Sequence, residues 1–313
     1  MKPMAHSSDE VIALSNLGKW FWSRLRTKKW AVRGLTIRLD RGETVGLLGP
    51  NGSGKSTTIK MLLGFLQPSE GTIKILGSAP RARSARASLG YLPENPRLPR
   101  FLTARQCLSY FGQLYGLTGA ALARSIDRNL ELVRLQHARH ERIQGFSKGM
   151  VQRLAFAQSL MNEAQVLILD EPMSGLDPLG RMEIRNLLQS IRSERPMNTI
   201  LFSTHILSDV EELCTSVILL KNGSMITHSP ISSILETGKQ TFEVLVQNVN
   251  PHIPLPVASS ARPTGDGRIR FTASGTQELT RLLQELERSH GEVIRVESRQ
   301  NRLEEVLFGE QQV

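Results

Sequence analysis

The stretch GPNGSGKST, at residues 49–57, restricts the possible folds of this chain more than any other feature. It matches the phosphate-loop pattern G-x-x-x-x-G-K-[ST], it follows the short apolar run Thr44–Leu48, and it precedes the helical apolar spacing of Thr58–Leu66. Between a strand and a helix, such glycines let backbone amides turn inward around a phosphate, and the helix N-terminus adds partial positive charge. The sequence therefore predicts an α/β domain with a nucleoside triphosphate site.

Individual residues of this loop are expected to have distinct roles. Lys55 can reach the β- and γ-phosphates, and the Ser56 hydroxyl can ligate magnesium. A purely structural glycine-rich turn is the alternative interpretation of the same residues. The predicted nucleotide-binding set consists of Gly49, Pro50, Asn51, Gly52, Ser53, Gly54, Lys55, Ser56 and Thr57.

An acidic pair at the end of a second apolar run supplies the expected partner of the loop. The run VLILDEP, at Val166–Pro172, has four residues of buried type and then two carboxylates, at the strand end where the ligand sites of α/β folds form. Asp170 is expected to hold magnesium through its water shell. Glu171, one residue farther out, is placed to activate an attacking water as a general base. A solvated acidic turn is the alternative.

The order of strand-like and helix-like segments divides the chain into two domains. The two kinds alternate from the start to about Pro230, and helical apolar spacing dominates between Leu89 and Ala164. This pattern predicts an α/β domain over residues 10–235 with a helical subdomain at about 90–164. A small α+β domain over residues 240–313 is predicted from strands at Thr241–Val249, Arg268–Ala273 and Glu292–Glu297, a helix with Leu279, Leu282, Leu283 and Leu286, and a loop at Pro251–Pro263.

Composition excludes several classes of protein. The 313 residues suffice for about two domains, and a hydrophobic share of 40% excludes wholesale disorder. No apolar run approaches the ~20 residues of a membrane span, and the first residues do not resemble a signal peptide. The two cysteines, Cys107 and Cys214, suit a reducing compartment. We therefore expect a soluble cytoplasmic protein.

The net charge of +10 is concentrated near the start of the chain. Residues 1–105 hold 18 of the 39 Lys and Arg residues but only 6 of the 29 Asp and Glu residues. A basic region of this kind attracts phosphate, nucleic acid or anionic lipid headgroups. Composition alone does not distinguish these three partners.

Three further motifs make the chain resemble the ATP-binding cassette (ABC) ATPases, the motor subunits of ABC transporters. FSKGMVQRL at Phe146–Leu154 precedes the acidic pair, SGLDP at Ser174–Pro178 follows it, and ILFSTH ends in His205. The resemblance covers residues 10–230. It implies a mixed-sheet core with a helical subdomain, ATP and Mg²⁺ as ligands, and ATP hydrolysis.

The resemblance also implies roles for residues outside the phosphate loop. Ser147 and Gly149 resemble the residues that bind the γ-phosphate held by the opposite subunit, so that two chains close head to tail around two ATP molecules. Asp177 corresponds to the loop that communicates across this dimer. His205 corresponds to the residue that contacts the γ-phosphate and the attacking water.

The resemblance further implies an aromatic ring that stacks on the adenine, one hairpin before the phosphate loop. We expect Phe21 in this role, with Trp22 as the alternative. Base–aromatic stacking contributes about 1–3 kcal/mol in other nucleotide sites. A ring that merely belongs to the core of the domain is the competing interpretation.

Departures from the family pattern indicate one branch of the family. Lys148 and Met150 replace the usual Gly and Gln of the signature, and Glu94 stands where many members have a glutamine that contacts magnesium. Both substitutions are familiar in the export branch, which moves drugs, lipids and polysaccharides. The ending NRLEEVLFG, at Asn301–Gly309, resembles the terminal helix of accessory domains in that branch. For this accessory domain, dimerisation is favoured over ligand sensing.

The resemblance predicts a homodimer that works beneath a separately encoded integral membrane permease, as a peripheral protein on the cytoplasmic face of the membrane. Two alternatives stay open. The first is a non-transport ABC ATPase acting on nucleic acid or ribosomes, against which the single cassette argues. The second is a low-turnover regulatory module, against which the intact set of Lys55, Asp170, Glu171 and His205 argues.

Overall fold

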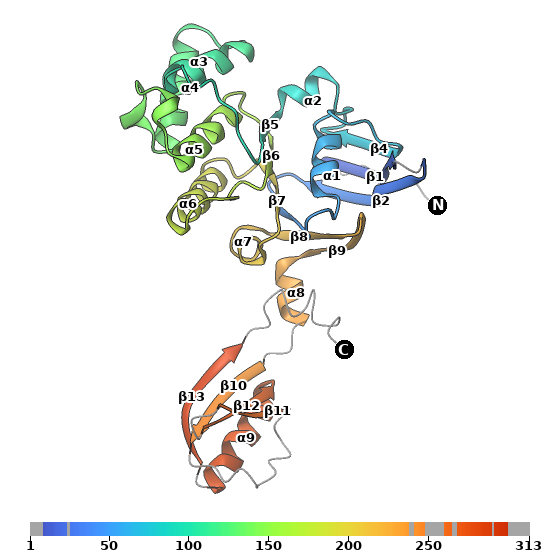
Figure 1. Cartoon of the computed structure of the whole chain (residues 1–313), viewed down its shortest axis with the longest axis vertical. Coiled ribbons are helices and arrows are strands. Elements are labelled where there is room, and N and C mark those ends of the chain that lie inside the picture. Colours follow the sequence, from blue (N-terminus) through green and yellow to red (C-terminus); the bar gives the residue numbers. More distant parts are fainter. Residues whose placement is uncertain are drawn as a thin grey trace. The chain divides into compact units, whose positions relative to one another are not determined.

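A computed structural model describes residues 9–23, 26–237, 241–247, 260–264, 268–289 and 291–299 of the chain (Figure 1). It divides into two compact units, Met1–Ser229 and Pro230–Val313. The helix α8, Ile231–Thr237, therefore belongs to the second unit, whereas the sequence pattern placed the division after residue 235.

A six-stranded sheet forms the centre of the first unit. Its first five strands are parallel, and the strand order is β5 (Leu89–Leu92), β6 (Val166–Asp170), β7 (Thr199–Thr204), β3 (Thr44–Leu48), β8 (Ser216–Lys221) and β9 (Ser224–Pro230). The last two strands are joined by Asn222 and Gly223, with φ of 51° and 79°, as a type I′ hairpin turn requires. Parallel and antiparallel pairs thus coexist, which confirms the predicted mixed sheet.

The parallel strands are mainly apolar because both faces of the sheet are buried. In β6, Leu167 and Leu169 face a core shared with helices, while Val166 and Ile168 face a core shared with a second sheet. Side chains alternate between the two faces of a strand, so a sheet covered on both sides needs continuous apolar runs rather than alternating ones. The continuous apolar runs in the sequence are therefore a consequence of burial on both faces of the sheet.

The second sheet of this unit is antiparallel and packs with the helix of the phosphate loop. Its strands, in the order β2-β1-β4, are β2 (Lys28–Asp40), β1 (Glu10–Trp22) and β4 (Glu70–Ile75). Leu14, Leu17 and Leu35 of this sheet share a core with Ile59 and Met61 of α1 (Lys55–Leu62). The long β1–β2 hairpin thereby lies against the element that carries the phosphate loop.

Helices gather on the other side of the parallel sheet, as Figure 1 shows for α3, α4 and α5. Thr103 and Gln106 form a capping box at the start of α3, with hydrogen bonds of 2.9 and 3.2 Å. Besides α1, the helices described in this unit are α2 (Arg83–Ala87), α3 (Ala104–Leu114), α4 (Gly119–Leu132), α5 (Lys148–Ser159), α6 (Pro178–Glu194) and α7 (Leu207–Leu213), with short 3₁₀ turns at Gln136–Ala138 and Ile143–Gly145. Among the described residues, no helix is both long and apolar enough to cross a lipid bilayer.

The second unit is a small antiparallel sheet with one helix packed on it. The strand order is β11 (Ser260–Pro263), β12 (Ile269–Ser274), β10 (Thr241–Gln247) and β13 (Glu292–Arg299). Leu282 and Leu286 of α9 (Thr276–Arg288) share a core with Val244 and Phe271. The spacing that predicted this amphipathic helix therefore reflects its packing on the sheet.

Two expectations for the second unit need comment. The predicted loop at Pro251–Pro263 is wrong at its end, because residues 260–263 pair with β12 as strand β11. Pairing overrides the weak local signal of this Pro-ending segment, and an edge strand tolerates a proline. Residues 251–259 and the segment Asn301–Gly309 lie outside the described residues.

Candidate active site

Three motifs that are far apart in the sequence meet at the carboxyl edge of the parallel sheet. The register pairs Leu48 with Thr204 and Asp170 with Ser203. The phosphate loop after β3, the acidic pair at the end of β6 and His205 after β7 therefore leave the sheet at the same edge. This is the edge where α/β folds bind ligands.

A cavity of about 600 Å³ opens at this edge and is large enough for a nucleotide. Its lining combines the phosphate loop, the aromatic end of the β1–β2 hairpin and polar residues from three other segments. These lining residues are Phe21, Trp22, Ser23, Lys29, Trp30, Ala31, Asn51, Gly52, Gly54, Lys55, Ser56, Thr57, Glu94, Glu171, Ser174 and His205.

The phosphate loop is held open by backbone contacts with the hairpins around it. Gly54 has φ of 110°, and a Cβ atom at this position would lie 2.7 Å from the Ala31 carbonyl oxygen, so only glycine fits. The backbone N–H of Gly223 donates to the Ser53 carbonyl at 3.0 Å, and the Arg33 N–H donates to the Gly223 carbonyl at 2.7 Å. The β8–β9 turn thus braces the loop against β2.

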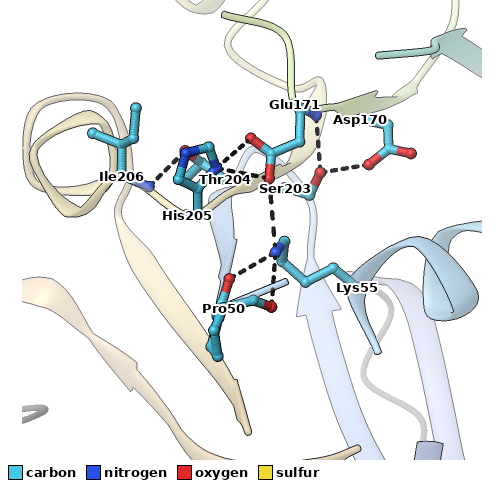
Figure 2. A network of polar contacts seen from close by, with 9 residues as sticks. Pro50, Lys55, Asp170, Glu171, Ser203, Thr204, His205 and Ile206 are labelled. Carbon is cyan, nitrogen blue, oxygen red and sulfur yellow. Dashed lines mark hydrogen bonds and ion pairs between the residues drawn. The ribbon is translucent and has the colours of Figure 1, made fainter. Parts of the chain in front are cut away.

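The carboxylate of Glu171 lies between two basic side chains (Figure 2). Lys55 Nζ is 3.7 Å from Glu171 Oε1 and also donates to the carbonyl oxygens of Gly49 at 2.6 Å and Pro50 at 3.3 Å. His205 Nδ1 is 3.0 Å from Glu171 Oε2. An ionised carboxylate can only accept, so Nδ1 carries the proton and Nε2 stays available on the other side of the ring.

Two buried polar residues that the sequence analysis did not single out hold the acidic loop in place. The Ser203 hydroxyl contacts Asp170 Oδ1 at 2.7 Å and the Glu171 N–H at 2.9 Å. Gln152 Nε2, from the signature helix α5, donates to the Pro172 carbonyl at 2.8 Å. Both residues lie inside motifs that were quoted from the sequence, but nothing local distinguishes their side chains from their neighbours.

The donor set at this edge fits a magnesium ion. Mg²⁺ prefers hard oxygen ligands and is usually held by one or two carboxylates together with substrate phosphates. The hydroxyl of Ser56 and the carboxylate of Glu94 line the cavity, and Asp170 ends the neighbouring strand with only 8% of its surface exposed. Ser56 and Asp170 are the residues that would hold the ion, with Glu94 as a further oxygen donor.

Both candidate adenine-stacking rings line the cavity. Phe21 is 44% exposed and has Lys19 Nζ at 5.4 Å from its ring centroid. Trp22 is 64% exposed and stands edge-to-face with Trp20 at 5.3 Å between centroids. The prediction of an aromatic wall one hairpin before the loop agrees with this geometry, but the geometry does not choose between the two rings.

Seven predicted ligand-binding residues are not among those that line the cavity. Gly49, Pro50 and Ser53 belong to the phosphate loop, and Asp170 ends β6 beside it. The other three lie outside these two motifs. Ser147 is exposed and caps α5 by accepting the Met150 N–H at 3.2 Å, and Gly149 lies within the first turn of that helix. Asp177 is exposed and caps α6 by accepting the Gly180 N–H at 2.7 Å. In a single chain, Ser147 and Asp177 are therefore exposed helix caps.

Comparison with known sequences and structures finds ABC transporter proteins. The family model for ABC transporters matches residues 32–174. The uncharacterized ABC transporter ATP-binding protein YxlF of Bacillus subtilis is 43% identical over 62% of this chain. The matched part spans 64% of YxlF, which is less than two thirds of its length.

Two further matches cover larger shares of this chain. The Nod factor export ATP-binding protein I of Rhizobium sp. (strain N33) is 33% identical over 88% of this chain and 90% of that protein. The solved structure of cbiO1 from Clostridium perfringens, part of the ABC transporter complex cbiONQ, matches with a TM-score of 0.65 and 29% identity. That match covers 73% of this chain and 92% of the solved chain.

Proposed function

This chain belongs to the ABC transporter family as an ATP-binding protein, and we propose that it hydrolyses ATP as a homodimer to drive a separate membrane permease that exports its substrate. The observation that carries the proposal is the contact of Glu171 with both Lys55 and His205 at the cavity end of the phosphate loop. Members of this family are ATPases, and this arrangement supplies the groups that phosphoryl transfer to water needs.

Each of the three side chains has a role in the hydrolysis step. As the oxygen of a water attacks the γ-phosphorus, the bond to the bridging oxygen of ADP breaks and the Glu171 carboxylate accepts a proton from that water. His205, fixed through Nδ1, orients the water and the γ-phosphate from the mouth of the cavity. Lys55 supplies positive charge next to the phosphates. Ser56 and Asp170 would hold a magnesium ion, which would supply positive charge to neutralise the phosphate oxygens.

The exposed position of the signature residues supports a head-to-tail dimer. Ser147 and Gly149 present a helix start with no role in their own cavity, and such a start favours an anion. We place them on the γ-phosphate bound by the partner subunit, with Asp177 at the same interface.

A second groove in the first unit supports a permease partner. It has a volume of about 350 Å³, and it is lined by Leu63, Phe65, Arg86, Leu89, Tyr91, Pro93, Pro96, Arg97, Leu98, Phe111, Tyr115 and Gln158. The segment after β5 contributes Glu94 to the nucleotide cavity and Pro93, Pro96 and Arg97 to this groove. One short segment therefore touches both places, which suits the transmission of ATP binding to a partner docked in the groove.

The export direction and the location at the membrane rest on the relatives. The Rhizobium relative that aligns with 88% of this chain is named for Nod factor export. By analogy, we place the protein on the cytoplasmic face of a membrane, bound to its permease.

The proposal is tested by recovering the full chain with its partner from detergent-solubilised membranes of its own organism. Tyr115→Glu places a charge in the groove, and Tyr110→Glu, on the exposed side of α3 outside the groove, is the matched control. We expect the wild type and Tyr110→Glu to recover the same integral membrane protein and to hydrolyse ATP, and Tyr115→Glu to lose the partner but keep ATP binding. Recovery of ribosomes or nucleic acid instead would favour a non-transport ABC ATPase.

A further inference from the structure

Ser203 occupies a central position in the polar network of the active site, although neither motif nor resemblance assigns it a role. It lies on β7 between β6 and β3, paired with Asp170 on one side and with Leu47 on the other, and it is fully buried. Figure 2 shows its hydroxyl between the Asp170 carboxylate and the Glu171 backbone. A carboxylate can only accept, so the hydroxyl donates to Asp170 and accepts from the Glu171 N–H.

The backbone of Glu171 is in a conformation that needs such a restraint. Its φ is 45°, in the left-handed region that non-glycine residues rarely occupy, and the following residue is Pro172. A residue before proline prefers extended backbone, so local preferences oppose this geometry. Unusual backbone of this kind persists when surrounding contacts determine it, and the hydrogen bond from the Glu171 N–H to Ser203 is one such contact.

The consequence of this backbone geometry is the direction of the Glu171 side chain. From the left-handed position its carboxylate reaches Lys55 at 3.7 Å and His205 at 3.0 Å. The same hydroxyl holds Asp170 through Oδ1. Two carboxylates with different roles are therefore oriented by one side chain that is itself fixed in a central strand.

We propose that Ser203 is a positioning residue for ATP hydrolysis, which places the general base Glu171 and orients Asp170 without touching the substrate. The inference rests on the proposed function, because it assumes that Glu171 is the base. A buried hydroxyl that only satisfies its own hydrogen bonds is the competing interpretation, and it predicts a loss of stability without a specific loss of turnover.

Three substitutions at Ser203 separate these interpretations. Ser203→Thr keeps the hydroxyl, Ser203→Val has the same shape as Thr without the hydroxyl, and Ser203→Ala removes the hydroxyl without added bulk. We expect kcat to fall about 10- to 100-fold in the Val and Ala variants, because a small displacement of a catalytic group has effects of that size. The Kd for ATP, measured separately by calorimetry, should change less than about threefold, and the Thr variant should recover most of the wild-type kcat.

Thr199→Val is the matched control on the same strand. Thr199 is fully buried at the other end of β7, where its hydroxyl donates to the Asp40 carbonyl at 2.9 Å and accepts from the Gly42 N–H at 3.2 Å. It therefore also loses two hydrogen bonds, and its melting temperature should fall as in Ser203→Val. Its kcat should stay at the wild-type value, since Thr199 is outside the active site.

Glu171→Gln separates failure of this inference from failure of the proposed function. If Glu171→Gln keeps wild-type turnover, the proposed base is wrong, whatever Ser203 does. If Glu171→Gln is inactive and Ser203→Ala and Ser203→Val both keep wild-type kcat, only the role of Ser203 is overturned. If Ser203 acts through the base, Ser203→Ala should lower the residual turnover of Glu171→Gln by less than about threefold. A full additional loss in the double variant would contradict the placement of Glu171 by Ser203, because only an effect through the base disappears when the base is already absent.

Discussion

Two surfaces of the first unit, the carboxyl edge of the parallel sheet and the signature surface with Ser147 and Asp177, differ in how complete they are within one chain. At the carboxyl edge of the sheet, Glu171 contacts both Lys55 and His205, and the Asp170 carboxylate accepts a hydrogen bond from the buried Ser203 hydroxyl. At the signature surface, Ser147 and Asp177 are exposed, and each accepts a backbone N–H of its own helix. The first surface is preorganised, and the second is a pair of helix caps.

This difference indicates that the free energy for closing the site has to come from a ligand held by another chain. Preorganised groups lose little freedom when a ligand arrives, so they can act as soon as it is bound. Exposed caps gain a catalytic role only when a ligand held elsewhere reaches them. A chain with one surface of each kind suits a reaction that proceeds only after two copies have met.

Replacing the base should give the largest effect and tests the preorganised surface directly. Glu171→Gln removes the proton acceptor but keeps the shape of the side chain, so kcat should fall about 10²- to 10⁴-fold. ATP affinity should persist, and an ATP-bound dimer should accumulate on size-exclusion chromatography. Steady-state hydrolysis near the wild-type rate would show that this network is not the catalytic centre.

A bulky cation on the signature surface should give the next largest effect. Ser147→Arg leaves the phosphate loop of its own chain unchanged but blocks closure on the partner's γ-phosphate. We expect ATP binding to persist while turnover falls at least about 100-fold, or about 2.7 kcal/mol in the barrier. Ser147→Asp keeps the ability to cap α5 and adds a charge that repels phosphate, so a similar loss would exclude lost capping as the cause.

Mixing two inactive variants shows in which chain the signature residue acts. A mixed dimer of Ser147→Arg and Lys55→Ala has both lesions in one composite site and one site intact, so part of the activity should return. If Ser147 acts within its own chain, each subunit has a damaged site and no activity returns. Dimer formation with ATP is measured in the same mixture, because strict coupling of two sites would also prevent recovery.

A largely buried ion pair connects two helices of the first unit: α6, which follows Asp177, and α7, which follows His205. Arg185 on α6 contacts the fully buried Asp209 on α7 at 2.5 Å and Glu212 at 2.6 Å. Arg185→Met leaves the Asp209 carboxylate without this partner, and the free energy of unfolding should fall by about 2 kcal/mol, below the usual range because Arg185 is partly exposed.

The matched variant for the ion pair lies on the same helix. Arg192→Met loses a hydrogen bond to the Leu213 carbonyl, which is 3.2 Å long, and should reduce stability by about 1 kcal/mol or less. Urea unfolding compares the two variants with the wild type. Equal losses in both would mean that the buried carboxylate is not the reason for the stability of this helix pair.

A moderate effect, on ATP affinity rather than on turnover, is expected at the aromatic wall of the preorganised surface. Phe21→Ala should weaken ATP binding by about 1–3 kcal/mol through lost stacking. Trp22→Ala should have a smaller effect, since its ring already packs edge-to-face on Trp20. Fluorescent nucleotide titration measures both constants, and a larger loss at Trp22 would assign the stacking role to that ring instead.

The sequence by itself determined the phosphate loop, the acidic pair and an α/β domain. These features are encoded locally, because a glycine pattern, an apolar run and a strand-end carboxylate are each read within about ten residues. The same local reading identified the amphipathic helix of the second unit. The mixed sheet, and candidate adenine-stacking rings one hairpin before the loop, were implied by the resemblance to the ABC ATPases.

Only the tertiary structure decided which side chains meet. Ser203 and Asp170 are 33 residues apart, and Gly223 and Ser53 are farther still, yet both pairs are in contact because parallel strands place distant segments side by side. The left-handed backbone of Glu171 also depends on such a contact, against the local preference of a residue before proline. Local patterns therefore indicated the chemistry of the site, and its geometry came from strand order, which neighbouring residues in the sequence do not encode.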